Sequence, residues 1–228
     1  MIRSAKIDWE INILTLRQEI LLLPSTWSPH FNTQHYEGEW TVLPLRAPGG
    51  HHDRIIPDLM QEGEYQDTPL MQNCPAIRQL ISTFQCPIRS VRLLNLKRGA
   101  IIKEHRDHEL AFEHGEARLH IPVFTNEHVE FFVQQERIIM EPGECWYINA
   151  NLPHRVANYG PTDRIHLVID CTVNDWLREL FERSPKTTVA EERKTGELLK
   201  MIFELRLQNT DITNKLADEL EQSLLEQA

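Results

Sequence analysis

The sequence predicts a mainly β protein, a barrel or jelly roll flanked by helices. Two observations support this fold class: the strand-like segments are short and follow one another closely, and turn residues separate them. Both features are typical of all-β barrels. The predicted strands are residues 100–105, 117–124, 129–133, 137–140, 144–149, 154–158 and 163–170, punctuated by Gly99, Gly115, Gly143 and Gly160.

The N-terminal half adds two helices and a further strand. Residues 10–23 carry apolar side chains at helical spacing and stop at Pro24, so we expect a helix that covers one face of a sheet. Residues 75–84 predict a second helix, because Pro75 stands in its first turn. Residues 88–96 predict a strand that ends just before Gly99.

The composition changes after about residue 180. The tail is rich in Glu, Leu and Lys, and its leucines fall on two helical stripes separated by residues 209–211. We therefore predict two domains: residues 1–180 as the β domain with its N-terminal helical cover, and residues 181–228 as a C-terminal helical extension. The extension is either a hairpin packed on the barrel or a dimerisation element, and the second alternative implies a homodimer.

Length and charge limit the possible partners. A chain of 228 residues with 41% hydrophobic residues can bury a substantial core in one large domain. The formal net charge of −10 argues against nucleic acid and against a polybasic membrane surface. A local basic pocket could still bind a small anionic substrate.

The cysteines and the N-terminus predict a cytoplasmic location. The four cysteines form no Cys-x-x-Cys pair and are too sparse for a disulfide framework. Residues 1–9 lack the apolar core of a signal peptide, and no apolar run approaches the length of a membrane span. We therefore expect a soluble, reduced protein.

The sequence His-Arg-Asp at residues 105–107 predicts a metal site. Alternate residues of a strand point the same way, so one skipped residue places His105 and Asp107 on one face. His154 would then come from a different strand. Two imidazoles and a carboxylate suit Fe(II), and on one face of an octahedron they leave three positions for a co-substrate and O₂.

Two predicted strands carry arginine and histidine at alternate positions. Arg164 and His166 would face one cavity, while the apolar residues between them pack behind. Arg118 and His120 share a face in the same way. A guanidinium can fork onto a carboxylate, so two such strands converging on one metal imply an anionic co-substrate.

As an ordered set, these segments resemble the aspartyl/asparaginyl β-hydroxylase family of Fe(II)/2-oxoglutarate oxygenases, in the bacterial branch that includes the cis-proline hydroxylases. The matching segments, within about residues 10–180, are 105–107, 115–122, 142–147, 151–154 and 163–170. The resemblance implies a double-stranded β-helix, the cupin-like form of the jelly roll. It also implies the site: Fe(II) on His105, Asp107 and His154, and 2-oxoglutarate held by Arg164 with Arg118, His120 and His166 assisting.

The resemblance implies a reaction as well. An unactivated C–H of an amino acid, or of an amino-acid-derived or peptidyl substrate, would be hydroxylated with O₂, releasing succinate and CO₂. The carboxylate of such a substrate needs a further cation. The candidates are Arg46, which precedes a Pro-Gly-Gly loop, and Arg155, which follows the distal histidine.

Two other functions remain open at this point. A cupin-type metalloprotein would share the barrel, but cupins usually carry a second histidine where Asp107 stands. A metal-free binding protein on the same barrel would have no need to retain the three ligands and Arg164. Residues 51–53 repeat the His-x-Asp spacing, but they follow Pro-Gly-Gly with no alternating strand, so we expect a loop at the mouth of the site.

Overall fold

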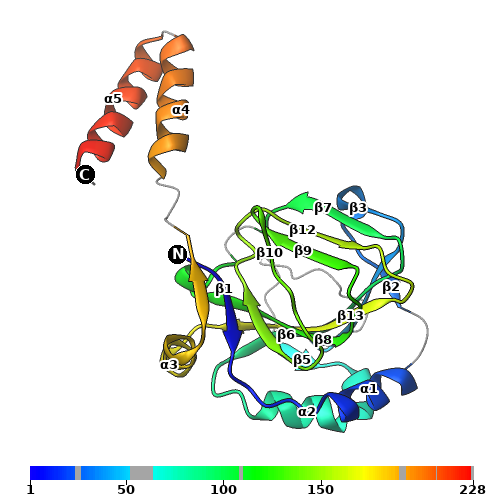
Figure 1. Ribbon diagram of the computed structural model, residues 1–228. Coiled ribbons are helices and arrows are strands. Elements are labelled where there is room, and N and C mark those ends of the chain that lie inside the picture. Colours follow the sequence, from blue (N-terminus) through cyan, green and yellow to red (C-terminus); the bar gives the residue numbers. More distant parts are fainter. Residues whose placement is uncertain (24–26, 52–63, 108–109, 190–193, 209, 227–228) are drawn as a thin grey trace. The chain divides into compact units, whose positions relative to one another are not determined.

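The computed structural model describes residues 1–23, 27–51, 64–107, 110–189, 194–208 and 210–226. The chain divides into two compact units (Figure 1). One comprises Ile2–Thr187 and contains the candidate site, and the other comprises Thr188–Ala228 together with Met1.

The first unit is built on two antiparallel sheets, so the mainly β prediction is confirmed. Strands of the larger sheet are β1 (Ile2–Ile7), β2 (Ser28–Pro29), β4 (Trp40–Pro48), β5 (Tyr65–Asp67), β6 (Ile88–Leu96), β8 (Glu116–Phe124), β11 (Cys145–Ile148), β13 (Arg164–Thr172) and β14 (Lys186–Thr188). Strands of the smaller sheet are β3 (Tyr36–Glu37), β7 (Ile101–His105), β9 (Val129–Val133), β10 (Glu136–Arg137) and β12 (His154–Asn158). The orders are β14-β1-β11-β8-β13-β6-β4-β2, with β5 on β4, and β10-β9-β12-β7-β3.

Three helices pack against one face of the larger sheet and form the main hydrophobic core with it. They are α1 (Ile13–Leu22), α2 (Pro75–Ser82) and α3 (Asp175–Arg183). The core residues of the three central strands include Val91, Leu93, Leu119, Ile121, Leu167 and Ile169. Because side chains of a strand alternate between its two faces, the arginines of opposite parity, Arg92, Arg118 and Arg164, line a cavity on the other side.

The sequence analysis missed several elements of this unit and misjudged the length of another. The missed elements include helix α3 and strands β1, β2, β3, β5 and β14. Helix α3 starts after Asn174, whose side-chain oxygen accepts a hydrogen bond from the Leu177 amide at 3.1 Å. This capping signal could have been read from the sequence. The strand predicted at 137–140 was too long, because β10 ends at Arg137.

The second unit contains two helices, α4 (Lys194–Gln208) and α5 (Asp211–Glu226), on either side of the predicted break. Arg206 of α4 donates hydrogen bonds to Asp218 and Glu221 of α5, at 2.6 and 3.0 Å. The exposed apolar side chains described in this unit are Met201, Phe203, Leu207, Ile212 and Leu216. Within the described residues, no helix is both long and apolar enough to cross a membrane.

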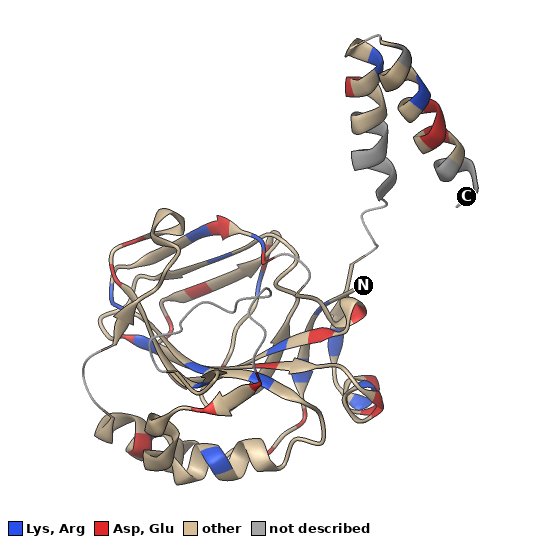
Figure 2. Ribbon diagram, turned by 180° about the vertical axis from the view of Figure 1, so that it is seen from behind, with Lys and Arg blue, Asp and Glu red and all other residues tan. Residues whose placement is uncertain are grey.

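Charges of both signs are interspersed over the strands and helices of the first unit (Figure 2). All four cysteines, at positions 74, 86, 145 and 171, are buried and free of disulfides. A few charged residues, among them Arg92, Arg164 and Asp170, are buried inside this unit instead.

Candidate metal centre

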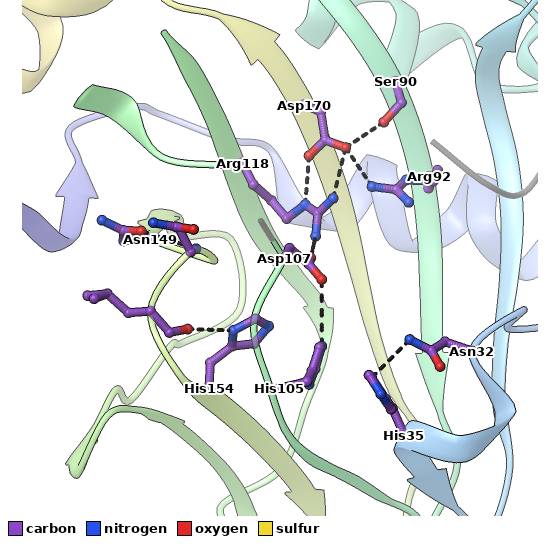
Figure 3. A network of polar contacts seen from close by, with 12 residues as sticks. Asn32, His35, Ser90, Arg92, His105, Asp107, Arg118, Asn149, His154 and Asp170 are labelled. Carbon is purple, nitrogen blue, oxygen red and sulfur yellow. Dashed lines mark hydrogen bonds and ion pairs between the residues drawn. The ribbon is translucent and has the colours of Figure 1, made fainter. Parts of the chain in front are cut away.

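His105, Asp107 and His154 converge where the inner strands β7 and β12 of the smaller sheet end and begin (Figure 3). His105 is the last residue of β7 and His154 the first of β12, and the antiparallel ladder pairs them directly. Their ring centroids lie 4.2 Å apart, and His105 Nε2 lies 3.9 Å from Asp107 Oδ1. One candidate ligand atom of each residue lies within 4.8 Å of the others, as no other such group in the described part of the chain does.

Both histidines are held in the tautomer that leaves Nε2 free to bind a metal. Nδ1 of His105 bonds the Lys103 carbonyl at 2.8 Å, and Nδ1 of His154 bonds the Leu152 carbonyl at 3.0 Å. A carbonyl can only accept, so each Nδ1 carries the proton and each Nε2 lone pair is free. Burial, together with the nearby His105, lowers the pKa of His154 to about 4, so this ring is a neutral ligand at pH 7.

The carboxylate of Asp107 is ionised. Burial opposes its ionisation, but Arg118 and the two histidines outweigh burial and hold the pKa of Asp107 below its usual value. Arg118 donates a hydrogen bond to Asp107 Oδ2. The three groups therefore offer two imidazole nitrogens and one carboxylate, a donor set that fits Fe(II).

Behind Asp107 lies a buried ionic network centred on Asp170 (Figure 3). Arg118 donates to it from Nε at 2.7 Å and from Nη2 at 3.2 Å. Arg92 donates at 2.5 Å and the Ser90 hydroxyl at 2.8 Å. Although burial opposes ionisation, the two arginines hold the pKa of Asp170 well below its usual value.

Arg164 is buried without a carboxylate partner among the described residues. Its side chain donates to Nδ1 of His166 at 2.9 Å and lies over the Phe131 ring, while its Nε–H has no hydrogen-bond partner. Burial lowers the pKa of this guanidinium to about 9. His120, also buried, has an unpartnered Nδ1. A bound anion would satisfy these groups.

The three candidate metal ligands and Arg164 line the same cavity, which has a volume of about 190 Å³. Its wall also contains His30 and Trp40, whose rings stack with centroids 3.5 Å apart. Burial and the nearby Arg92 lower the pKa of His30 to about 3, so His30 is a neutral group there. The cavity thus combines a metal-ligand cluster, an unpaired cation and an aromatic wall.

The structure does not bring all the predicted residues into this cavity: His166 bonds Arg164 but does not itself line the wall. Arg46 forms an ion pair with Asp67 at 2.7 Å and does not line it. Arg155 follows His154 on β12 and so faces away, where it lies over Phe132. His51 is exposed, whereas His52 and Asp53 fall outside the described residues.

Among the cavity residues that sequence reasoning missed are three polar ones on the central strands: Ser90, Arg92 and Asp170. A signal for each was present. Asp170 has the same parity on its strand as Arg164, and Ser90 and Arg92 alternate with Val91 and Leu93. Alternation could therefore have assigned all three to the cavity face.

The family model of the aspartyl/asparaginyl beta-hydroxylases matches residues 10–173. The chain is 30% identical over 174 residues to an L-proline cis-4-hydroxylase of Rhizobium meliloti (strain 1021), covering 73% of this chain and 61% of that protein. It is 29% identical over 138 residues to L-proline cis-3-hydroxylase 2 of a Streptomyces species, covering 58% of this chain and 47% of that one. It therefore spans less than two thirds of the length of either relative.

Among solved structures, a 2OG-Fe(II) oxygenase family oxidoreductase from Burkholderia pseudomallei aligns with 70% of this chain and 78% of its own. The TM-score is 0.49 and the sequence identity 13%. Since the family model spans most of the β unit, including all three candidate ligands, the chain belongs to the aspartyl/asparaginyl β-hydroxylase family.

Proposed function

We propose that this chain is an Fe(II)/2-oxoglutarate-dependent dioxygenase that hydroxylates an amino acid or an amino-acid-derived or peptidyl substrate. One observation carries the proposal. A two-histidine, one-carboxylate cluster shares a cavity with Arg164, a buried arginine without a described counter-ion. A metal alone would not need that arginine, whereas a metal-chelating dicarboxylate would.

His105 Nε2, His154 Nε2 and Asp107 Oδ1 would hold the iron. When bound, Fe(II) supplies oxygen activation coupled to the decarboxylation of 2-oxoglutarate to succinate and CO₂. The Lys103 and Leu152 carbonyls fix the two imidazoles by holding the proton on Nδ1. The cavity wall excludes water and orients the reacting C–H.

Arg164 is the proposed partner of the distal carboxylate of 2-oxoglutarate. His166 accepts a hydrogen bond from it and would fix its orientation, and His120 could donate or accept at its free Nδ1. Arg118 is a weaker candidate for this contact than its sequence pattern suggested, because its nitrogens already bond Asp107 and Asp170.

The substrate proposed is a small amino acid, because both matched relatives are named for L-proline. Its carboxylate would bind Arg92 rather than the predicted Arg46. Arg92 lines the cavity and gives one terminal nitrogen to Asp170, while no described hydrogen bond uses its Nη1. Arg46 is already paired with Asp67.

Three further parts of the prediction remain proposals. They are the assignment of residues 1–180 and 181–228 as oxygenase domain and helical extension, a homodimer through α4 and α5, and a cytoplasmic location. The exposed apolar side chains of α4 and α5 are compatible with such a dimer.

The test is turnover of the purified protein with Fe(II), 2-oxoglutarate and a panel of amino acids and short peptides. Succinate and a product heavier by one oxygen are expected. His105→Ala and Asp107→Ala should abolish both, whereas His128→Ala, which changes an exposed histidine, should not. Iron binding without consumption of 2-oxoglutarate would favour the cupin-type alternative, and failure to bind iron would favour the binding protein.

A further inference from the structure

Arg118 joins the metal cluster to the Asp170 network. It lies partly buried on β8, and all three nitrogens of its guanidinium are engaged: Nε and Nη2 by Asp170, and Nη1 by Asp107. Such a planar fork fixes the direction of each hydrogen bond, which a flexible ammonium group cannot do. The position of Asp107 relative to Asp170 is thus set by one rigid side chain.

Asp107 itself has few other constraints. It lies beyond the end of β7, and its backbone amide bonds the Ala150 carbonyl at 2.8 Å. Among the described residues, the contacts of its carboxylate are Arg118 at Oδ2 and His105 at Oδ1. The direction of this carboxylate therefore depends on Arg118.

Asp170, in contrast, is fixed by the centre of the larger sheet. It pairs across the ladder with Arg118 of β8 on one side and with Ser90 of β6 on the other. Ser90 and Arg92 both donate to its Oδ2. These contacts come from the strands on either side of β13. They hold Asp170 in place, so it can serve as a rigid support for Arg118.

We propose that Arg118 is a positioning residue that presents Asp107 to the metal through one oxygen, with Asp170, Ser90 and Arg92 as its support. With Oδ2 bound to Arg118, Oδ1 is the oxygen that faces His105. A carboxylate that bound iron through both oxygens would take one more coordination position, and by holding Oδ2 Arg118 would leave that position to the co-substrate. The inference rests on the proposed function, since it concerns the same iron site.

The test is anaerobic Fe(II) binding to the full chain in competition with a chelator, measured without turnover. Arg118→Met should weaken Fe(II) binding about 10- to 100-fold, the usual effect of losing a group that orients a metal ligand. Arg118→Lys, which keeps the buried charge, should weaken it about 10-fold, because one ammonium cannot bond both carboxylates as the fork does. Arg98→Met is the matched control, since the Arg98 contact to Asp163 runs through its backbone amide.

A second measurement separates this role from co-substrate binding. At saturating iron, the KM for 2-oxoglutarate should change less than about threefold in Arg118→Lys. Wild-type iron affinity in Arg118→Lys overturns the inference, and a large rise in this KM with unchanged iron affinity reassigns Arg118 to the co-substrate. If Arg118→Met does not fold, the iron affinity of Arg118→Lys alone tests the inference. A wild type that binds no iron refutes the proposed function itself.

Discussion

Arg164 and Asp170 face the same side of strand β13, but Asp170 is paired with oppositely charged groups and Arg164 is not. Asp170 receives hydrogen bonds from two arginines, whereas Arg164 has no carboxylate partner in the part of the chain that the structure describes. One face of one strand thus carries a fully paired anion near the candidate metal ligands and an unpaired cation further along. We therefore expect substitutions of Arg164 and of Asp170 to have different consequences.

Arg164→Lys should weaken 2-oxoglutarate binding and leave iron binding intact. Lysine keeps the charge but loses the two parallel hydrogen bonds that a guanidinium offers a carboxylate. We expect the KM for 2-oxoglutarate to rise about 10-fold or more, with Fe(II) affinity within about twofold of the wild type. Arg98→Lys serves as the control. An unchanged KM would move the co-substrate contact to another cation of the cavity.

Arg164→Met should leave the ligand-free protein at least as stable as the wild type. Methionine removes a buried charge whose pKa burial lowers to about 9, and this removes a desolvation cost. The variant also leaves Nδ1 of His166 without its donor, which costs roughly 1 kcal/mol. Urea unfolding should therefore show no loss, or a gain of about 1 kcal/mol, while 2-oxoglutarate no longer raises the Tm. A clear loss of stability would mean that Arg164 has a structural partner.

Asp170→Asn should destabilise the fold strongly, by about 3 to 5 kcal/mol, because it leaves the buried Arg92 and the partly buried Arg118 without their shared anion. The wild type should also lose stability in acid. The pKa of Asp170 is lower in the folded state than in the unfolded chain, so its contribution is complete above the unfolded value near pH 4 and falls away below it. Unfolding measured from pH 7 to pH 3 should show a shallower decline for Asp170→Asn, and parallel curves would contradict this role.

Much of the fold could be predicted because strand alternation is a local property. The apolar residues of β6, β8 and β13 face the helices, and the arginines of opposite parity line the cavity, as alternation requires. The spacing of His105 and Asp107 likewise identified a compact cluster. The short distance to His154 could not be derived from spacing, because it depends on the register of β7 against β12.

The hydrogen-bond partners of a side chain were harder to predict than the face of the sheet on which it lies. Alternation placed Arg118 toward the cavity, but which carboxylates it bonds depends on cross-strand pairing with Asp170 and on the loop that carries Asp107. Arg46 shows the same limit. Its direction is set by pairing with Asp67 on β5, across a segment whose course the sequence does not reveal.

The choice of substrate cation gives the last prediction. If Arg92 binds the substrate carboxylate, Arg92→Lys should raise the KM for the amino acid about 10-fold and leave the KM for 2-oxoglutarate within about twofold, since lysine can still bond Asp170. Arg46→Gln should change neither constant, because its pairing with Asp67 lies outside the cavity wall. The measurement is succinate formation and mass gain across a panel that begins with L-proline and its ring analogues. A raised amino-acid KM in Arg46→Gln, with Arg92→Lys unaffected, would return the role to Arg46. Oxidation of a metabolite that carries no carboxylate would mean that neither Arg92 nor Arg46 has this role, because neither cation would then have an anion to bind.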